Sequence, residues 1–504
     1  MTMSNMFQLA LYLLPAAIIG SILYLILNTK ARNEFLSKLG VQALRPSTFF
    51  TPPRELSPEK QGLPSNRTAS KTSNPTYEDV FPPSRRHTLA ELAEDSLKGP
   101  GRSATELAEQ PVDYGRLTPH ISTPTTDDFA DDVTATGFTV DEIRRLGDFP
   151  DYATLSGVPL PEPCEGFKIE TALPRPYRPF RWAYHQTMSL TKMESDWWLE
   201  LDSNYRETIR LREELFEEHG PVVIQTLPGS EIAAKELMEM CLQFLCARYP
   251  HYFSLDIPNH VFHNRVLNTQ TNLQSTQPMQ VLLHNIPEDF AIMIRDPETG
   301  IYSFRGGIIM SSLGWSLGSK IGLKLHEIHA PIPDYKEKMQ FSMDRYFSKK
   351  PTDKPIQRGS WGLEIDKPLF MPPGDAHELH RDTQNPEHGI DRVHLRVDWQ
   401  TLRRLPLSGA VVFNFRGLFT PVTEFRDEPY IPSLVLKVLR EGKKSIMEYK
   451  GTWHTEHIVI PYLEMCEREQ RETGLIEENW EHKTLDESPF YPGWEEKWHR
   501  QQGF

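Results

Sequence analysis

Pairs of histidines three residues apart are the feature of this sequence that most directly suggests chemistry. Four such pairs occur: His260/His263, His326/His329, His377/His380 and His454/His457. On a helix this spacing places two imidazoles on one face, where they could share a metal ion. Two imidazoles alone are a weak zinc signal, and the His-Glu-x-x-His pattern of zinc peptidases is absent. A single imidazole could instead ligate haem iron, so both uses stay open at this point.

Motifs for other cofactors are missing from the chain. There is no G-x-G-x-x-G after a strand and no P-loop, so a nicotinamide, flavin or ATP site of those kinds is not indicated. An iron–sulfur cluster needs clustered cysteines, whereas the four cysteines are scattered. Cys241 and Cys246 lie on an expected helix and are interpreted as buried core thiols. The net charge of -14 disfavours nonspecific binding to nucleic acid, which needs a basic surface.

The N-terminal segment, residues 1–29, is expected to be a transmembrane anchor. Residues 7–27 carry no charge and are long enough to span a bilayer as a helix. Lys30, Arg32 and Lys38 follow, and the positive-inside rule then places the next part of the chain in the cytosol. A cleaved signal peptide is the alternative, but its basic leading region is missing. The pattern predicts a single-pass membrane protein with a cytosolic soluble domain, in an organelle that the sequence does not name.

A linker and a globular domain are expected to follow this anchor. Residues 30–179 are rich in Pro, Ser, Thr and acidic residues, which disfavours long helices and central strands and predicts a largely disordered linker. Within it, residues 139–148 could form a short capped helix. Residues 180–490 are expected to be the globular domain, and residues 491–504 a C-terminal tail.

The globular domain shows both helical and strand periodicities. Helices are expected at 195–219, 230–248 with Ser230 as N-cap, 334–348, 430–441 and 456–470. A hairpin is expected from DFAIMIRD and IYSFRGGIIM around the turn at 297–300, and two strands are expected within 393–415. Helices before, between and after an antiparallel sheet predict an α+β fold.

Three long segments resemble a known family. They are DFAIMIRDPETGIYSFRGGIIMSSLGW at 289–315, KIGLKLHEIHAPIPDY at 320–335 and LRVDWQTLRRLPLSGAVVFNF at 395–415. In this order they are similar to the haem-dependent oxidative N-demethylase alpha-subunit family, especially its fungal HRQ-type members. The resemblance implies a PAS-like antiparallel sheet flanked by helices, with haem in a pocket. It also implies dioxygen and a small amine as substrates, with NADPH, FMN and a 2Fe-2S cluster on a separate reductase.

The resemblance also implies candidate site residues. The family's I-H-x-x-V-P element corresponds to residues 328–333, so His329 is expected to be the proximal haem ligand and therefore the metal-binding residue, with His326 as second choice. Arg305 and Lys320 could pair with the haem propionates. The alternatives are a hydrogen-bonded histidine at a turn and two surface cations.

The third segment departs from the family pattern. Where the family commonly has Arg-Val-Glu-Arg-Gln, this chain has Arg-Val-Asp-Trp-Gln at 396–400. On a strand Arg396, Asp398 and Gln400 share one face, and if that face lines the pocket Asp398 could bind an amine cation or relay protons. A charge ladder on the sheet surface is the alternative. The shortened carboxylate leaves a different or bulkier amine open as substrate.

Two functions follow from these observations. The first is a membrane-anchored haem-dependent oxidoreductase that removes an N-alkyl group from an amine. The second is a haem-binding PAS-like sensor or scaffold without enzymatic activity.

Overall fold

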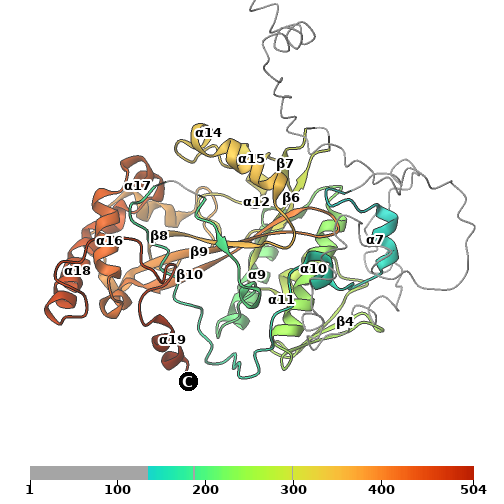
Figure 1. The fold of residues 1–504 in the computed structure, drawn as a ribbon, viewed down its shortest axis with the longest axis horizontal. Coiled ribbons are helices and arrows are strands. Elements are labelled where there is room, and N and C mark those ends of the chain that lie inside the picture. Colours follow the sequence, from blue (N-terminus) through green and yellow to red (C-terminus); the bar gives the residue numbers. More distant parts are fainter. Residues whose placement is uncertain (1–133, 186–187, 298, 504) are drawn as a thin grey trace, which may run out of the picture. The chain divides into compact units, whose positions relative to one another are not determined.

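A seven-stranded antiparallel sheet is the centre of the fold (Figure 1). The computed structural model describes residues 134–503 except 186–187 and 298. The strands of this sheet are β1 (Thr191–Lys192), β2 (Ile224–Thr226), β6 (Asp289–Arg295), β7 (Tyr302–Ile308), β8 (Ile356–Ile365), β9 (Val393–Arg404) and β10 (Val411–Pro421). They lie in the order β1-β8-β9-β10-β6-β7-β2, and β3 (Phe253–Asp256), β4 (Val261–Asn264) and β5 (Thr269–Asn272) form a second sheet. The mixture of helices with antiparallel sheets confirms the expected α+β class.

Helices occur before, between and after these strands. They are α7 (Val140–Leu146), α8 (Tyr152–Ser156), α9 (Tyr205–His219), α10 (Glu231–Arg248), α11 (Pro278–Asn285), α12 (Leu317–Lys320), α13 (Leu325–Ile328), α14 (Tyr335–Lys338), α15 (Gln340–Lys349), α16 (Ile431–Glu441), α17 (Lys444–Lys450), α18 (Trp453–Glu472) and α19 (Trp494–Gln502). Most elements expected from periodicity are confirmed, including α7, α10, α16 and α18 and the β6–β7 and β9–β10 hairpins. Strand β8 was not predicted.

The two faces of the sheet are covered by different helices. Alternate residues of a strand point to opposite faces, so Phe290 and Ile292 of β6 pack with α9, α10 and α11, while Ala291 and Met293 pack with α13 and α15. Figure 1 shows α9, α10 and α11 on one side of the sheet and α14 and α15 on the other. A further cluster joins β8 and β9 to α16 and α18. The face toward α13 and α15 is the one that carries the cavity described below.

Two helix boundaries differ in detail from the sequence expectation. The segment expected as one helix over 195–219 begins with a 3-10 turn at Ser195–Trp197 and becomes α-helical only from Tyr205. Ser230 precedes α10 as expected, but its side chain makes no capping bond. Its hydroxyl instead donates to the Leu227 carbonyl at 2.6 Å. The competing local acceptor explains why a residue of good N-cap type does not cap.

The packed domain begins well before residue 180. The short capped helix expected within 139–148 is α7, and its cap is a capping box in which Thr139 accepts from the Glu142 amide and Glu142 accepts from the Thr139 amide. Phe138 and Ile143 are buried in the largest core cluster, so the C-terminal part of the expected linker is folded. At the other end, α19 lies in the expected tail, and Trp498 donates from its indole nitrogen to the Leu173 carbonyl at 3.0 Å. Residues 30–133 of the expected linker lie outside the described residues.

The structure does not support the predicted membrane localisation, and that prediction is wrong. No helix within the described residues is long and apolar enough to cross a membrane. The predicted span at 7–27 falls outside the described part of the chain.

Candidate functional site

A cavity of about 910 Å³ lies against one face of the large sheet. Most of the strand residues that line it alternate along five strands: Ala291 and Met293 from β6, Phe304 from β7, Arg358 and Ser360 from β8, Gln400 and Leu402 from β9, and Phe413 and Phe415 from β10. Thr191 of β1 and the intervening Gly359, Trp361 and Trp399 also contribute to the lining. The register explains why the alternating residues share this face, because Arg358 pairs with Gln400 and Gln400 with Phe415. The volume of the cavity lies within the ~300–1,000 Å³ that is usual for small-molecule and cofactor sites.

The opposite wall is formed by the segment from residue 313 to 332 and by α15. This segment is fixed at its start by the buried carboxylate of Asp289. Asp289 accepts from the amides of Met310 and Ser311 at 2.8 and 2.7 Å and from the Ser311 hydroxyl at 2.6 Å. It also pairs with Arg212 at 2.6 Å. The residues that follow are thereby directed over the sheet face.

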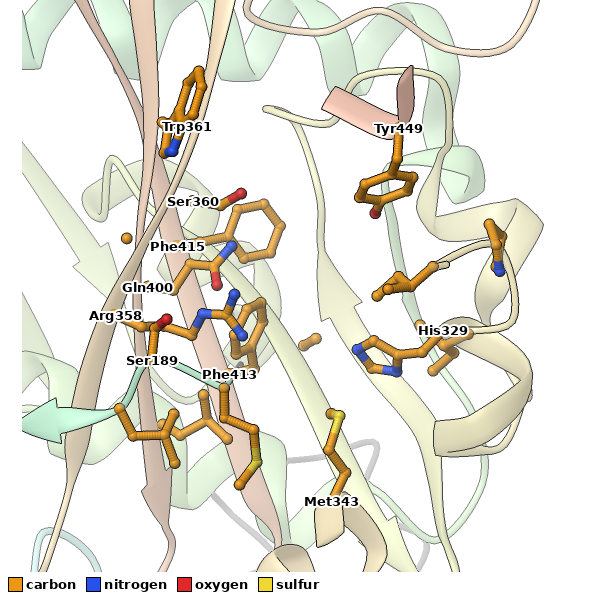
Figure 2. A pocket seen from close by; sticks show the side chains of 18 of the residues that line it. Ser189, His329, Met343, Arg358, Ser360, Trp361, Gln400, Phe413, Phe415 and Tyr449 are labelled. Carbon is orange, nitrogen blue, oxygen red and sulfur yellow. The ribbon is translucent and has the colours of Figure 1, made fainter. Parts of the chain in front are cut away.

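His329 projects from this wall into the cavity. Its Nδ1 lies 2.7 Å from the Leu325 carbonyl, one turn back along α13. A carbonyl can only accept, so Nδ1 carries the proton and Nε2 keeps its lone pair. The ring stacks on Tyr335 with centroids 5.3 Å apart. Figure 2 shows the imidazole directed across the cavity toward the wall that carries Arg358 and Gln400.

The environment of His329 favours the neutral imidazole. The pKa of His329 is lowered to about 4, mainly because the ring is buried; the bond to the Leu325 carbonyl opposes this effect, and the positive charges of Lys320 and Arg358 add to it. A neutral ring with a fixed tautomer is the form that binds metals through Nε2.

We therefore expect His329 to titrate near pH 4 in the haem-free protein, not near its ordinary value of 6.5. Unfolded chains bind the proton at about 6.5, so the stabilisation that His329 contributes is complete above that pH and declines as the pH falls from 6.5 to about 4. Imidazole resonances followed by NMR during a pH titration, with a His329→Gln variant to assign the signal, would measure this. A midpoint near 6.5 would contradict the described packing of the ring.

The cavity has an excess of positive charge. Arg181, Lys320, Arg358 and Lys450 line it, and Glu327 is the one carboxylate among the described lining residues. Burial lowers the pKa of Lys320. Such a cavity suits a ligand that brings negative charge.

A protein-family model matches the part of the chain that forms much of this cavity. The model of the family described as haem-dependent oxidative N-demethylase, alpha subunit-like matches residues 189–460. The chain belongs to this family. The match includes both cavity walls and His329, and it confirms the resemblance in the three sequence segments. Membership supports a haem-dependent, oxidative N-demethylase-like function at the level of the family.

Three of the predicted site residues lie together in the cavity of this N-demethylase-like domain. His329, Lys320 and Gln400 all line it. Lys320 also lies over the Trp315 ring, with Nζ 4.2 Å from the centroid. Of the three β9 residues that were expected to line the pocket, Gln400 does so.

The second-choice ligand and the second predicted cation lie elsewhere. His326 is not a lining residue; its Nδ1 is buried without a hydrogen bond among the described residues. Arg305 donates to the Pro228 carbonyl at 2.8 Å on the exposed side of β7. Neither position favours a role in the cavity.

Arg396 and Asp398 share the strand face with Gln400 but do not line the cavity. The Arg396 guanidinium is buried, donates to the Pro368 carbonyl at 2.7 Å and to the Ser311 carbonyl, and pairs with Asp398 at 2.8 Å. Arg396 thus ties β9 to the start of the opposite wall. The Asp398 carboxylate is engaged by this arginine, which lowers its availability for an amine cation.

The remaining histidine pairs do not form a metal centre. Within the part of the chain that the structure describes, no three His, Cys, Asp or Glu side chains come together as a metal site. His377 and His380 have ring centroids 4.8 Å apart, yet Nε2 of His377 is bonded to the Ile365 carbonyl. The expected core thiol Cys241 is buried, and burial raises its pKa well above the ordinary value.

Three cavity cations, Arg181, Arg358 and Lys450, were missed from the sequence. Arg358 lies on β8, a strand that was not predicted, so no sequence pattern indicated that this cation faces the cavity. Lys450 is the last residue of α17, and its Nζ donates to the Trp361 carbonyl at 2.7 Å and to the Ser360 hydroxyl at 3.1 Å. No local pattern indicated this contact, because it joins segments far apart in the chain.

Proposed function

We propose that this chain holds haem in the cavity through His329 and oxidatively removes an N-alkyl group from an amine. The observation that carries the proposal is the imidazole of His329, which is neutral, fixed through Nδ1 and directed by Nε2 into a cavity (Figure 2). An antiparallel sheet hollowed on one face and covered there by short helices also supports a PAS-like fold.

The residues present fit a haem. The group would need a nitrogen ligand, apolar walls for the macrocycle and cations for two carboxylates. His329 would supply the nitrogen, and Met293, Met343, Phe413 and Phe415 would supply apolar wall. Lys320 lies on the same wall as His329 and is the residue we propose for a propionate. When bound, haem supplies the activation of dioxygen.

The chain's own residues would position the substrate and exclude water. Phe413 and Phe415 present apolar surface to an N-alkyl group, and Gln400 offers an amide oxygen that can accept from an amine N–H. An N-methylamine, dioxygen, two electrons and two protons give the demethylated amine, formaldehyde and water. A C–H bond becomes a C–O bond and the C–N bond breaks. The electrons are expected from NADPH through a separate flavin and iron–sulfur protein.

Activity measurements on the haem-loaded full chain test the proposal. With N-methylamines, NADPH and a flavin and iron–sulfur reductase, we expect formaldehyde release that depends on dioxygen and on the amine. A matched sample without the amine measures uncoupled electron transfer. Stable haem binding without formaldehyde from any amine tested would favour the sensor or scaffold function. Failure of the chain to take up haem would refute both.

A further inference from the structure

We propose that the cavity binds an amine that also carries a carboxylate, such as an N-methyl amino acid, and that Arg358 and Lys450 bind this carboxylate. This inference rests on the proposed function for the reaction but names the class of substrate. It also gives a binding role to Arg358 and Lys450, which lie outside the segment 328–333 that contains His329.

The first argument is that Arg358 is a cation without a partner. Its guanidinium forms no hydrogen bond and no ion pair with any residue that the structure describes, and its buried Nε is unsatisfied. It projects into the cavity from β8 (Figure 2). Burial lowers its pKa, as does Arg181, while Tyr184 and Tyr449 oppose this effect. An enclosed and uncompensated cation is costly unless a ligand supplies the countercharge.

The second argument is that Lys450 lies beside Arg358. Its ammonium is held by the Ser360 hydroxyl and the Trp361 carbonyl, and neither of these groups is charged. Burial and Arg358 lower the pKa of Lys450 to about 7, with Asp398 acting in the opposite direction. Asp398 is already paired with Arg396. Two neighbouring cations with five or more N–H donors between them match the bidentate geometry of a carboxylate.

The third argument separates this carboxylate from a haem propionate. Arg358 lies on the sheet wall, opposite the wall from which His329 projects (Figure 2). A cation on the His329 wall is already available in Lys320. We therefore assign Arg358 and Lys450, across the cavity from Lys320, to the second occupant, and leave the second propionate to Arg181 or to solvent. A simple protonated amine would meet repulsion there, whereas the carboxylate of an amino acid is attracted.

Calorimetric binding of two matched amines tests the assignment. N-methylglycine carries the carboxylate, and N-ethylmethylamine has a methyl group in its place. We expect the wild-type chain to bind N-methylglycine more tightly, and Arg358→Gln and Lys450→Gln each to weaken it by about 10- to 100-fold, with little change for N-ethylmethylamine. Lys444→Gln removes an exposed charge from the same helix and serves as the matched control. Arg358→Lys keeps a cation and should restore part of the affinity.

Proton uptake gives a readout that does not depend on turnover. A carboxylate beside Lys450 should raise its pKa, so binding of N-methylglycine at pH 8 should take up a proton, measurable from the buffer dependence of the binding heat. Lys450→Gln should abolish this uptake while thermal melting shows the variant to be folded. Equal affinity for both amines, or no proton uptake, would overturn the proposal.

Haem content distinguishes the two sources of carboxylate. Arg358→Gln and Lys450→Gln should retain the wild-type amount of haem. Loss of haem with unchanged N-methylglycine affinity would assign both cations to a propionate and overturn the inference. If the wild-type chain takes up no haem, the proposed reaction fails, but calorimetry on the haem-free chain still decides the anion site. Binding of N-methylglycine that depends on Arg358 would support it, and absence of binding would refute it.

Discussion

Replacement of His329 by alanine is expected to remove haem binding. The side chain supplies the one cavity-lining imidazole with a fixed Nδ1 proton and a free Nε2 among the described residues. Loss of groups that only support a metal ligand already costs about 10- to 100-fold in affinity, so loss of the ligand itself should exceed about 100-fold. The Soret absorbance of the purified, haem-supplemented chain measures this directly.

His326→Ala is the matched control for this experiment. It removes an imidazole three residues away that does not line the cavity. We expect the His326 variant to keep its Soret band and its haem stoichiometry. A His329 variant that still binds haem with an unchanged spectrum would refute the ligand assignment. Loss of haem in the His326 variant alone would transfer the role to that residue.

Replacement of Asp289 by alanine is expected to destabilise the domain by about 3–5 kcal/mol, the usual consequence of leaving one partner of a buried ion pair uncompensated. Asp289 and Arg212 are both buried, with side-chain exposures of 0% and 3%. The carboxylate also holds the amides of Met310 and Ser311, which begin the wall that carries His329. Urea unfolding of the haem-free chain, followed by circular dichroism, would give the change in the free energy of unfolding.

Asp427→Ala provides the comparison for Asp289. Asp427 pairs with Lys497 at 2.7 Å, but its side chain is 66% exposed. Exposed pairs contribute roughly 0–1 kcal/mol, so this variant should unfold close to the wild type. Asp289→Ala should also reduce haem uptake, because it loosens the start of the His329 wall. An Asp289 variant as stable as the Asp427 variant would show that the buried network does not hold this wall.

Much of the local structure could be predicted because it depends on neighbours in the sequence. The capping box of α7 lies within four residues, and the β6–β7 hairpin follows from two apolar runs around a tight turn. Helix α10 could be predicted because apolar residues recur along one segment that no glycine or proline interrupts. The same local logic failed at Ser230, where the Leu227 carbonyl engages the hydroxyl. It also failed to find β8, because glycines and polar residues interrupt the apolar pattern of this strand between β1 and β9.

The sequence by itself determined the α+β class and the family, because these rest on periodicity and on continuous segments, and it marked His329 as the candidate ligand. Only the tertiary structure decided which charged residues share a cavity. Arg358 faces His329 because of the register between β8, β9 and β10, and Lys450 reaches Ser360 from a helix far along the chain. Asp398 lies two residues from Gln400 on the same face, yet its pairing with Arg396 keeps it out of the cavity. Cross-strand register and the endpoints of long-range contacts are set by the packing of the whole domain, and no short segment encodes them.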